Sequence, residues 1–181
     1  RLQEHYQQEV KEHMDLLATL TPRGGKYELL WGQADKAILE ASATYDLVLM
    51  GAHGANRFDN FFLGGVAGRV VRHSTVPILS VRDEATTTGI NRLLFATDFG
   101  EASKQAWHWC KPLREAGIKT VAINVIDDWR LQSEQGYIKT VADALSYLCE
   151  GQTEQQLICE GNPLEVLPAI AKEVAADAIV I

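Results

Sequence analysis

The sequence predicts an α/β protein with a doubly wound parallel sheet in two tandem repeats, and three observations support this prediction. Short apolar runs alternate with stretches of helical period, which is typical of parallel strands joined by helices. Residues 27–50 align with residues 155–181, each as strand, glycine, helix and strand. A strand over residues 45–50 opens into a glycine-rich loop, and open α/β sheets place their ligands at such strand ends.

Residues 1–83 are predicted to form the first unit. Its expected elements are a helix over residues 1–20, a strand over 27–31, a helix containing Ala37, Ile38 and Ala41, a strand over 45–50, a helix ending near His73 and a strand over 76–81. Asp35 or a residue near it is expected to cap the helix that contains Ala37. Pro77, near the start of the strand over 76–81, indicates a sheet edge, because its missing N–H costs nothing there. We expect another subunit or the sister domain to cover this edge.

A turn-rich stretch of low hydrophobicity, DEATTTG, ends the first unit, and residues 84–90 are predicted to be the linker. The second unit, residues 91–181, is expected to contain strands over residues 92–97, 121–126, 156–160 and 177–181, and helices over 102–113, 137–149 and 163–174. Of the tryptophans in its first helix, Trp107 and Trp109, we expect one in the core and the other partly exposed.

The glycine-rich loop carries the main functional signal. The chain reads LVLMGAHGANRFDNFFLGGVAGRVV over residues 47–71, in which Gly51, Gly54 and the pair Gly64 and Gly65 follow a strand and precede a helix. Glycine lets the backbone approach an anion without a Cβ in the way, and the first helical turn leaves N–H groups unpaired. The pattern therefore favours phosphate binding. The alternative is a loop whose glycines serve its conformation alone.

The whole string, G-x2-G-x9-G with V-A-x-R-V-V-R-H and V-P-I-L-S-V after it, resembles the universal stress protein family. The resemblance covers essentially the whole chain and implies an adenine nucleotide alpha-hydrolase-like (Rossmann-like) fold. It also implies a tandem-domain member cut at both ends, with residues 1–83 the C-terminal part of one domain and residues 91–181 the N-terminal part of the next. The chain opens with Arg1, so we expect its natural N-terminus to lie elsewhere.

In that family the loop binds an adenine nucleotide, so the resemblance implies ATP, ADP or AMP, with magnesium only as the nucleotide's companion. His53 would lie over the phosphates, and Val66 would follow the glycine pair at the helix start. Asp98, in the turn TDFGEAS, would accept hydrogen bonds from the adenine or ribose, although it is equally placed to cap the helix at Ala102. Val125 would meet the adenine edge through its backbone.

One residue departs from the family pattern. ATP-binding members usually carry Ser or Thr where this chain has Gly65, so a hydroxyl donor to phosphate is absent, while the backbone N–H remains. Gly65 therefore favours a degenerate site, and the intact Gly51, Gly54 and Gly64 favour a working one.

Composition argues against several other classes. The chain has 181 residues, 46% of them hydrophobic, and a net charge of −7, which argues against a nucleic-acid-binding face. No apolar run reaches membrane-spanning length. Three widely spaced cysteines form neither a disulfide framework nor a metal pattern, and they are expected to be buried thiols of a cytoplasmic protein: Cys110, Cys149 and Cys159. No H-x3-H or C-x2-C spacing predicts a metal site.

No catalytic machinery can be assembled from the sequence. It offers no recognisable nucleophile–base motif and no G-x4-G-K-[ST] lysine for phosphoryl transfer. We therefore expect no enzyme, but one of two kinds of protein. The first is a stress-response regulatory protein that binds an adenine nucleotide and pairs as a dimer through residues 76–81. The second is a nucleotide-independent interaction or scaffold module with a degenerate site.

Overall fold

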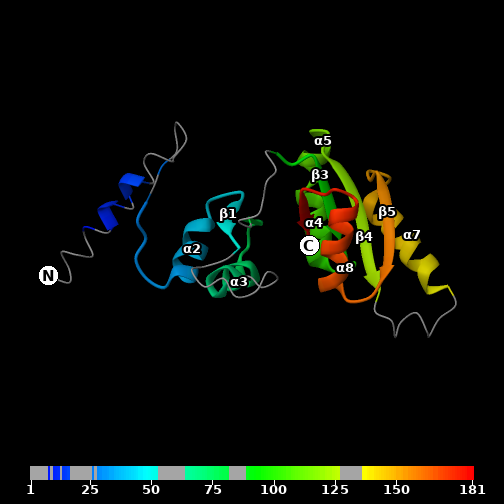
Figure 1. Ribbon diagram of the computed structural model, residues 1–181, viewed down its shortest axis with the longest axis horizontal. Coiled ribbons are helices and arrows are strands. Elements are labelled where there is room, and N and C mark those ends of the chain that lie inside the picture. The colour runs from blue at the N-terminus through cyan, green and yellow to red at the C-terminus, as the bar shows by residue number, and fades with distance from the viewer. Residues whose placement is uncertain are drawn as a thin grey trace. The chain divides into compact units, whose positions relative to one another are not determined.

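The structure is a computed structural model that describes residues 28–52, 64–81, 89–126 and 136–181, together with residues 8, 10–12, 14–16 and 26. The chain divides into two compact units, Arg1–Asp83 and Glu84–Ile181 (Figure 1). The predicted linker falls mostly on residues 82–88, which lie outside the described residues. Among the described residues, no helix is long and apolar enough to cross a membrane.

The second unit is a doubly wound parallel sheet. Its strands are β3 (Arg92–Ala96), β4 (Lys119–Ile126), β5 (Gln155–Glu160) and β6 (Ala178–Val180), in the order β5-β4-β3-β6 with every pairing parallel. Its helices are α4 (Glu101–Trp109), α5 (Lys111–Glu115), α7 (Tyr137–Cys149) and α8 (Pro163–Glu173). Because β6 returns to the far side of β3, the winding reverses between these two strands, and their carboxyl ends flank the switch point of the sheet.

Helices cover both faces of this sheet, as a parallel sheet requires (Figure 1). On one face Phe95 packs with Trp107 of α4 and Leu145 of α7. On the other face Leu94 and its neighbours on β4 pack against the apolar side of α8, including Ile170. Because successive side chains of β3 point to opposite faces of the sheet, Leu94 and Phe95 belong to two separate hydrophobic cores.

The helix expected over residues 102–113 is two helices. α4 ends at Trp109, and α5 follows after Cys110 with Pro112 in its first turn. Proline has no N–H to donate back into the preceding turn, so it ends one helix and fits at the start of the next. Trp107 is buried and Trp109 is 40% exposed, which confirms the expected division between them.

The first unit has a two-stranded parallel sheet, β1 (Val48–Gly51) and β2 (Ile78–Val81), with helices α2 (Ala34–Ser42) and α3 (Gly65–His73). Exposure alternates along β1: Val48 and Met50 are half-buried, whereas Leu49 is 66% exposed. Within the described residues β2 has β1 as its single strand neighbour, and its other side is open. This agrees with the edge position expected from Pro77.

Two expectations for the first unit were wrong. Residues 28–31 form no strand and are exposed, because the described part of this unit holds no third strand for them to pair with. Asp35 does not cap α2: the N-cap is Gln33, which makes no side-chain capping bond, while Asp35 lies within the helix and pairs with Arg69 of α3.

The two stretches that align in sequence share a backbone feature. Gly32 before α2 has φ 126°, and Gly161 before α8 has φ 128°. Both values lie in the region that favours glycine over L-residues. Each glycine is followed by a helix and then by a parallel strand, β1 in the first unit and β6 in the second.

Candidate functional site

The candidate site lies where β1 ends and α3 begins. β1 stops at Gly51, and α3 starts at Gly65. The Ala52 N–H donates to the Val81 carbonyl over 2.8 Å, and the Gly64 N–H donates to the Ala52 carbonyl over 2.8 Å. These bonds hold the strand end and the helix start together across the loop. His53 and Gly54, predicted to contact the phosphates, lie outside the described residues.

The first turn of α3 has backbone donors without a partner inside the helix. Gly64 is the N-cap, and as a glycine it has no side chain that could cap the helix. The N–H groups of Gly65, Val66 and Ala67 have no intrahelical acceptor, since the first carbonyl to accept is that of Gly64, from Gly68 over 2.7 Å. Such an end carries partial positive charge and suits an anion.

An ion pair between α2 and α3 adds a cation beside this helix start. Arg69 donates from Nε to Oδ2 of Asp35 over 2.8 Å, and Nη1 of Arg69 lies 3.6 Å from the point that a Cβ at Gly65 would occupy. Asp35 is only 6% exposed. Burial raises the pKa of its carboxyl, but the hydrogen bond and charge of Arg69, with backbone and Gln33 hydrogen bonds, outweigh burial and lower the pKa. Asp35 is therefore ionised at neutral pH.

At the other end of α3, His73 behaves as expected for the last residue of a helix. Its Nδ1 lies 2.8 Å from the Arg69 carbonyl oxygen, so the ring satisfies a carbonyl of the last turn. This contact leaves His73 outside the candidate site.

In the second unit, Asp98 lies at the carboxyl end of β3 beside the switch point. Its Oδ1 accepts from the Gly100 N–H over 2.8 Å and from the Ser103 hydroxyl over 3.1 Å. The backbone bond from Gly100, then the bond from Ser103, lower the pKa of Asp98. Asp98 thus holds the turn before α4, but the capping alternative was wrong: the N-cap is Gly100, and α4 has no side-chain capping bond. The Asp98 carboxylate remains exposed.

Asn124 is a residue of this edge that the sequence reasoning missed. It is 7% exposed, and its Nδ2 donates to the Thr97 carbonyl over 2.7 Å, which ties the turn after β3 to β4. Its only sequence signal is a single amide within the apolar run VAINVI. Val125 follows it, half-buried and paired with Cys159 of β5. The structure therefore brings Asp98 and Val125 to neighbouring strand ends of one sheet.

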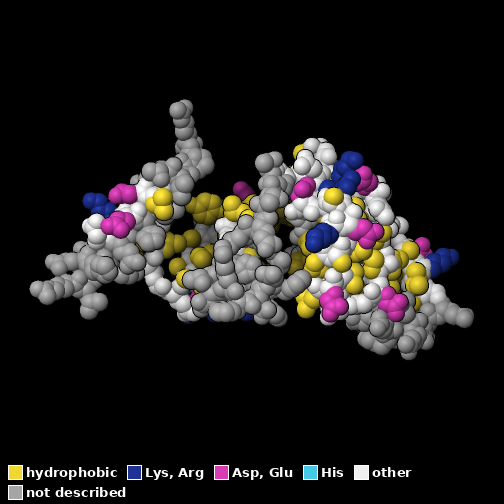
Figure 2. Space-filling view, in the orientation of Figure 1, with side chains coloured by type: hydrophobic (Ala, Val, Ile, Leu, Met, Phe, Trp, Pro, Cys, Tyr) yellow, Lys and Arg dark blue, Asp and Glu magenta, His cyan; other side chains and the backbone are white. Residues whose placement is uncertain are grey.

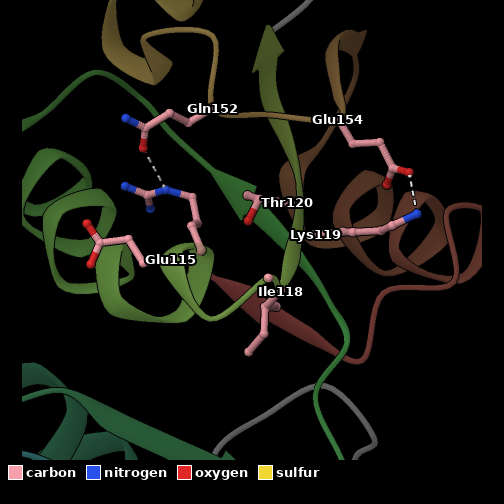
Figure 3. Close-up of a pocket in the computed structure, with 8 residues that line it drawn as sticks. Glu115, Ile118, Lys119, Thr120, Gln152 and Glu154 are labelled. Carbon is pink, nitrogen blue, oxygen red and sulfur yellow. Dashed lines mark hydrogen bonds and ion pairs between the residues drawn. The ribbon is translucent and has the colours of Figure 1, made fainter.

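A hollow of about 510 Å³ lies at the opposite edge of this sheet (Figure 3). Lys119 donates to Glu154 over 3.0 Å, and Arg114 donates to the neutral amide of Gln152 over 3.3 Å. With Glu115, the lining holds two positive and two negative side chains, so it carries no net charge. Among the described residues, no group of three or more His, Cys, Asp or Glu side chains is placed to hold a metal ion.

Comparison with known proteins relates the chain to one family. Residues 1–82 match the model of the universal stress protein family. A stretch of 57 residues is 39% identical to universal stress protein Slr1230 of Synechocystis sp. and covers 30% of this chain but only 20% of that protein. The structure of a universal stress protein from Archaeoglobus fulgidus has a TM-score of 0.72 at 24% identity, over 97% of this chain and 68% of its own.

A universal stress protein in complex with cAMP is more distantly similar, with a TM-score of 0.37 and 18% identity over 51% of this chain and 75% of its own, too little to carry its ligand over. The likeness to the Archaeoglobus fulgidus protein shows that the chain has that protein's α/β fold with parallel sheets. The family match rests on residues 1–82, which contain the glycine loop. The likeness to the universal stress protein family is therefore shown for residues 1–82, and the chain covers only a fifth of the length of the Synechocystis relative.

Proposed function

We propose that this protein is a stress-response regulatory protein that binds the phosphates of an adenine nucleotide at residues 51–65. The observation that carries the proposal is the open start of α3, joined to the end of β1 by the hydrogen bond from Gly64 to Ala52. The free N–H groups of Gly65 and Val66 are the donors that would hold the phosphates. Magnesium would accompany the nucleotide.

The expected affinity is modest. A hydrogen bond to a charged group contributes about 1.5–3 kcal/mol. Losing the family's usual hydroxyl at Gly65 should therefore weaken binding about tenfold or somewhat more, since about 1.4 kcal/mol corresponds to one decade. We expect AMP and ADP to bind nearly as well as ATP.

The rest of the proposal concerns the second unit and the assembly. We propose that the chain is of tandem-domain type, that Asp98 and the backbone of Val125 are nucleotide contacts, and that the protein binds rather than catalyses. The shared φ of Gly32 and Gly161 supports the repeat. The open side of β2 supports self-association there. Three free cysteines, two of them buried, support a reducing compartment such as the cytoplasm.

One observation favours the second candidate, a nucleotide-independent interaction module. In the described part of the first unit, Trp31 is 70% exposed, Tyr45 64% and Leu49 66%. Figure 2 shows hydrophobic side chains on the surface of this part of the chain. Large exposed apolar patches often mark interaction surfaces. A module of this kind would keep the fold without using the loop.

Isothermal titration calorimetry with ATP, ADP and AMP separates the two candidates. Gly65→Ser should tighten ATP binding, and its Cβ has room, because the nearest described neighbour, Nη1 of Arg69, would be 3.6 Å away. Gly64→Val should abolish binding but keep the fold, since φ −54° suits any residue and the new side chain would stand in the path of the phosphate. Replacing Gly54 by Val should do the same.

Gly89→Val is the matched control, because an added Cβ there meets nothing within 4 Å. It should bind as the unsubstituted protein does. The absence of heat with any adenine nucleotide, both before and after Gly65→Ser, would reject the nucleotide proposal and leave the interaction module.

A further inference from the structure

We propose that Arg69 is a phosphate ligand, which makes up part of the contact that a hydroxyl at Gly65 would otherwise make. This inference rests on the proposed function, because it concerns the nucleotide phosphate seated at the start of α3. It names a side-chain contact where the glycine motif offers backbone donors alone.

The position of Arg69 follows from helix geometry. Side chains of a helix lean toward its N-terminus, so a residue covers the surface about one turn before it. Arg69 stands four residues after Gly65, and its Nη1 lies 3.6 Å from the point where a Cβ at Gly65 would be. A hydroxyl there would be one bond farther out. The guanidinium and the family's hydroxyl would therefore donate to a ligand atom in the same volume beside the helix end.

The guanidinium is also held in place for this role. Nε is fixed by the 2.8 Å bond to Asp35, which is buried. Within the part of the chain that the structure describes, Nη1 and Nη2 of Arg69 donate to no other residue. Arginine presents five donors in a planar fork, so one edge can bind Asp35 while the terminal nitrogens remain for an anion. The Arg69 side chain is 44% exposed, which leaves it open to a ligand.

A purely structural ion pair is the competing explanation. Asp35 is buried, and its Oδ1 has no hydrogen-bond partner among the residues that the structure describes. Arg69 is therefore needed to compensate this carboxylate whether or not a nucleotide binds. The test therefore needs a measurement that reports on the surroundings of the phosphate itself. The phosphorus resonances of bound ADP serve this purpose, because they respond to the groups that touch the phosphates.

The experiment compares the unsubstituted protein with Arg69→Met, Arg69→Lys and Arg72→Met, using ADP in calorimetry and phosphorus NMR. Arg69→Met should weaken ADP about tenfold and shift a phosphorus resonance of the bound nucleotide. Arg69→Lys keeps the positive charge but not the planar fork of donors, so it should weaken ADP binding several-fold. This variant carries the test if Arg69→Met fails to fold. Arg72→Met is the matched control: it removes a charge from the last turn of the same helix and should change affinity less than twofold.

Gly65→Ser sharpens the test. If the serine hydroxyl and Arg69 serve one phosphate, Gly65→Ser should tighten ADP more in the Arg69→Met background than in the unsubstituted protein. ADP binding by Arg69→Met within twofold of the unsubstituted protein would overturn the inference and leave the proposed function intact. Weaker binding with unchanged phosphorus resonances would also overturn it, in favour of the structural ion pair. No ADP binding by the unsubstituted protein would overturn the proposed function and this inference with it.

Discussion

In the second unit, Gln155–Glu160 forms β5 and pairs with β4 from Val121 to Ile126, whereas the aligned residues 28–31 of the first unit lie exposed outside any strand. The sequences of the two stretches have the same pattern, strand then glycine then helix. The two stretches differ in whether a neighbouring strand is available for pairing. A strand satisfies its backbone N–H and C=O groups only through another strand, so the pattern becomes a strand where β4 is present and stays coil where the described unit offers no equivalent.

The strands that follow differ in the same way. In the second unit β6 pairs with β3, and Val180 packs against the core that contains Phe95 and Trp107. In the first unit β1 pairs with β2 alone, and Leu49 is 66% exposed. A similar strand is therefore a core element in one unit and a surface element in the other. Among the described residues, most of the buried apolar side chains belong to the second unit.

The largest expected effect is a contrast between two leucines. Leu94 is 0% exposed, so Leu94→Ala should destabilise the second unit by about 2–5 kcal/mol. Leu49→Ala should change the stability of the first unit by no more than about 0.5 kcal/mol, as is usual for exposed positions. Amide hydrogen exchange in the full chain measures the stability of each unit separately. A cost of several kcal/mol for Leu49→Ala would mean that its surface is covered in solution, and the contrast between the units would fail.

The next effect concerns alkaline pH and falls on the second unit, which contains all three cysteines. Burial, partly offset by the charge of Arg114, raises the pKa of the Cys149 thiol to about 11. Above about pH 8.5 the unfolded thiol ionises while the native one does not, so stability is full below that pH and falls as pH rises toward 11. The loss should be about 2.7 kcal/mol, because the pKa is raised from its ordinary value of 9.0 to about 11 and a pKa difference of one corresponds to about 1.36 kcal/mol.

Urea titrations of the unsubstituted protein and of Cys149→Ala, from pH 8 to 11, measure this loss. Cys149→Ala should start less stable but decline less steeply with pH. Equal slopes would show that Cys149 does not carry the alkaline sensitivity of the second unit.

The smallest expected effect compares the two glycines that precede the helices. Both have φ near 127°, so alanine should cost about 1–2 kcal/mol of backbone strain at either position. Gly161→Ala should cost more than Gly32→Ala, because its Cβ would meet Cγ2 of Val166 at 3.2 Å, whereas nothing lies within 4 Å at Gly32. Hydrogen exchange in each unit measures both. A negligible cost at Gly32 would mean that the first unit does not hold this turn as the second does.

The sequence predicts most of the described fold, because it rests on local signals. The apolar run of β1, the glycine pair before α3 and the helical period over Tyr137–Cys149 each identify an element without reference to the rest of the chain. The failures depend on partners far along the sequence. The role of Asp35 depends on Arg69, thirty-four residues away, and spacing alone cannot distinguish a capping residue from such a pair.

For the candidate site, the sequence indicates residues whose proposed role is phosphate binding through the backbone N–H, such as Gly64 and Gly65. Side chains that act through tertiary contacts were missed. The Asn124 amide and the Arg69 guanidinium are placed by neighbouring elements, and their sequence signals are ordinary. The structure supplies these contacts because it shows which elements lie side by side.

Nitrogen–proton NMR of the full chain, titrated with ADP, tests the central claim that the first unit holds the phosphates at the start of α3. The account predicts that the amide signals of Gly64, Gly65 and Val66 shift with increasing ADP and reach saturation, while those of α7 in the second unit, such as Leu145, stay in place. Shifts confined to the second unit, or no saturable shift at Gly64, Gly65 and Val66, would contradict it.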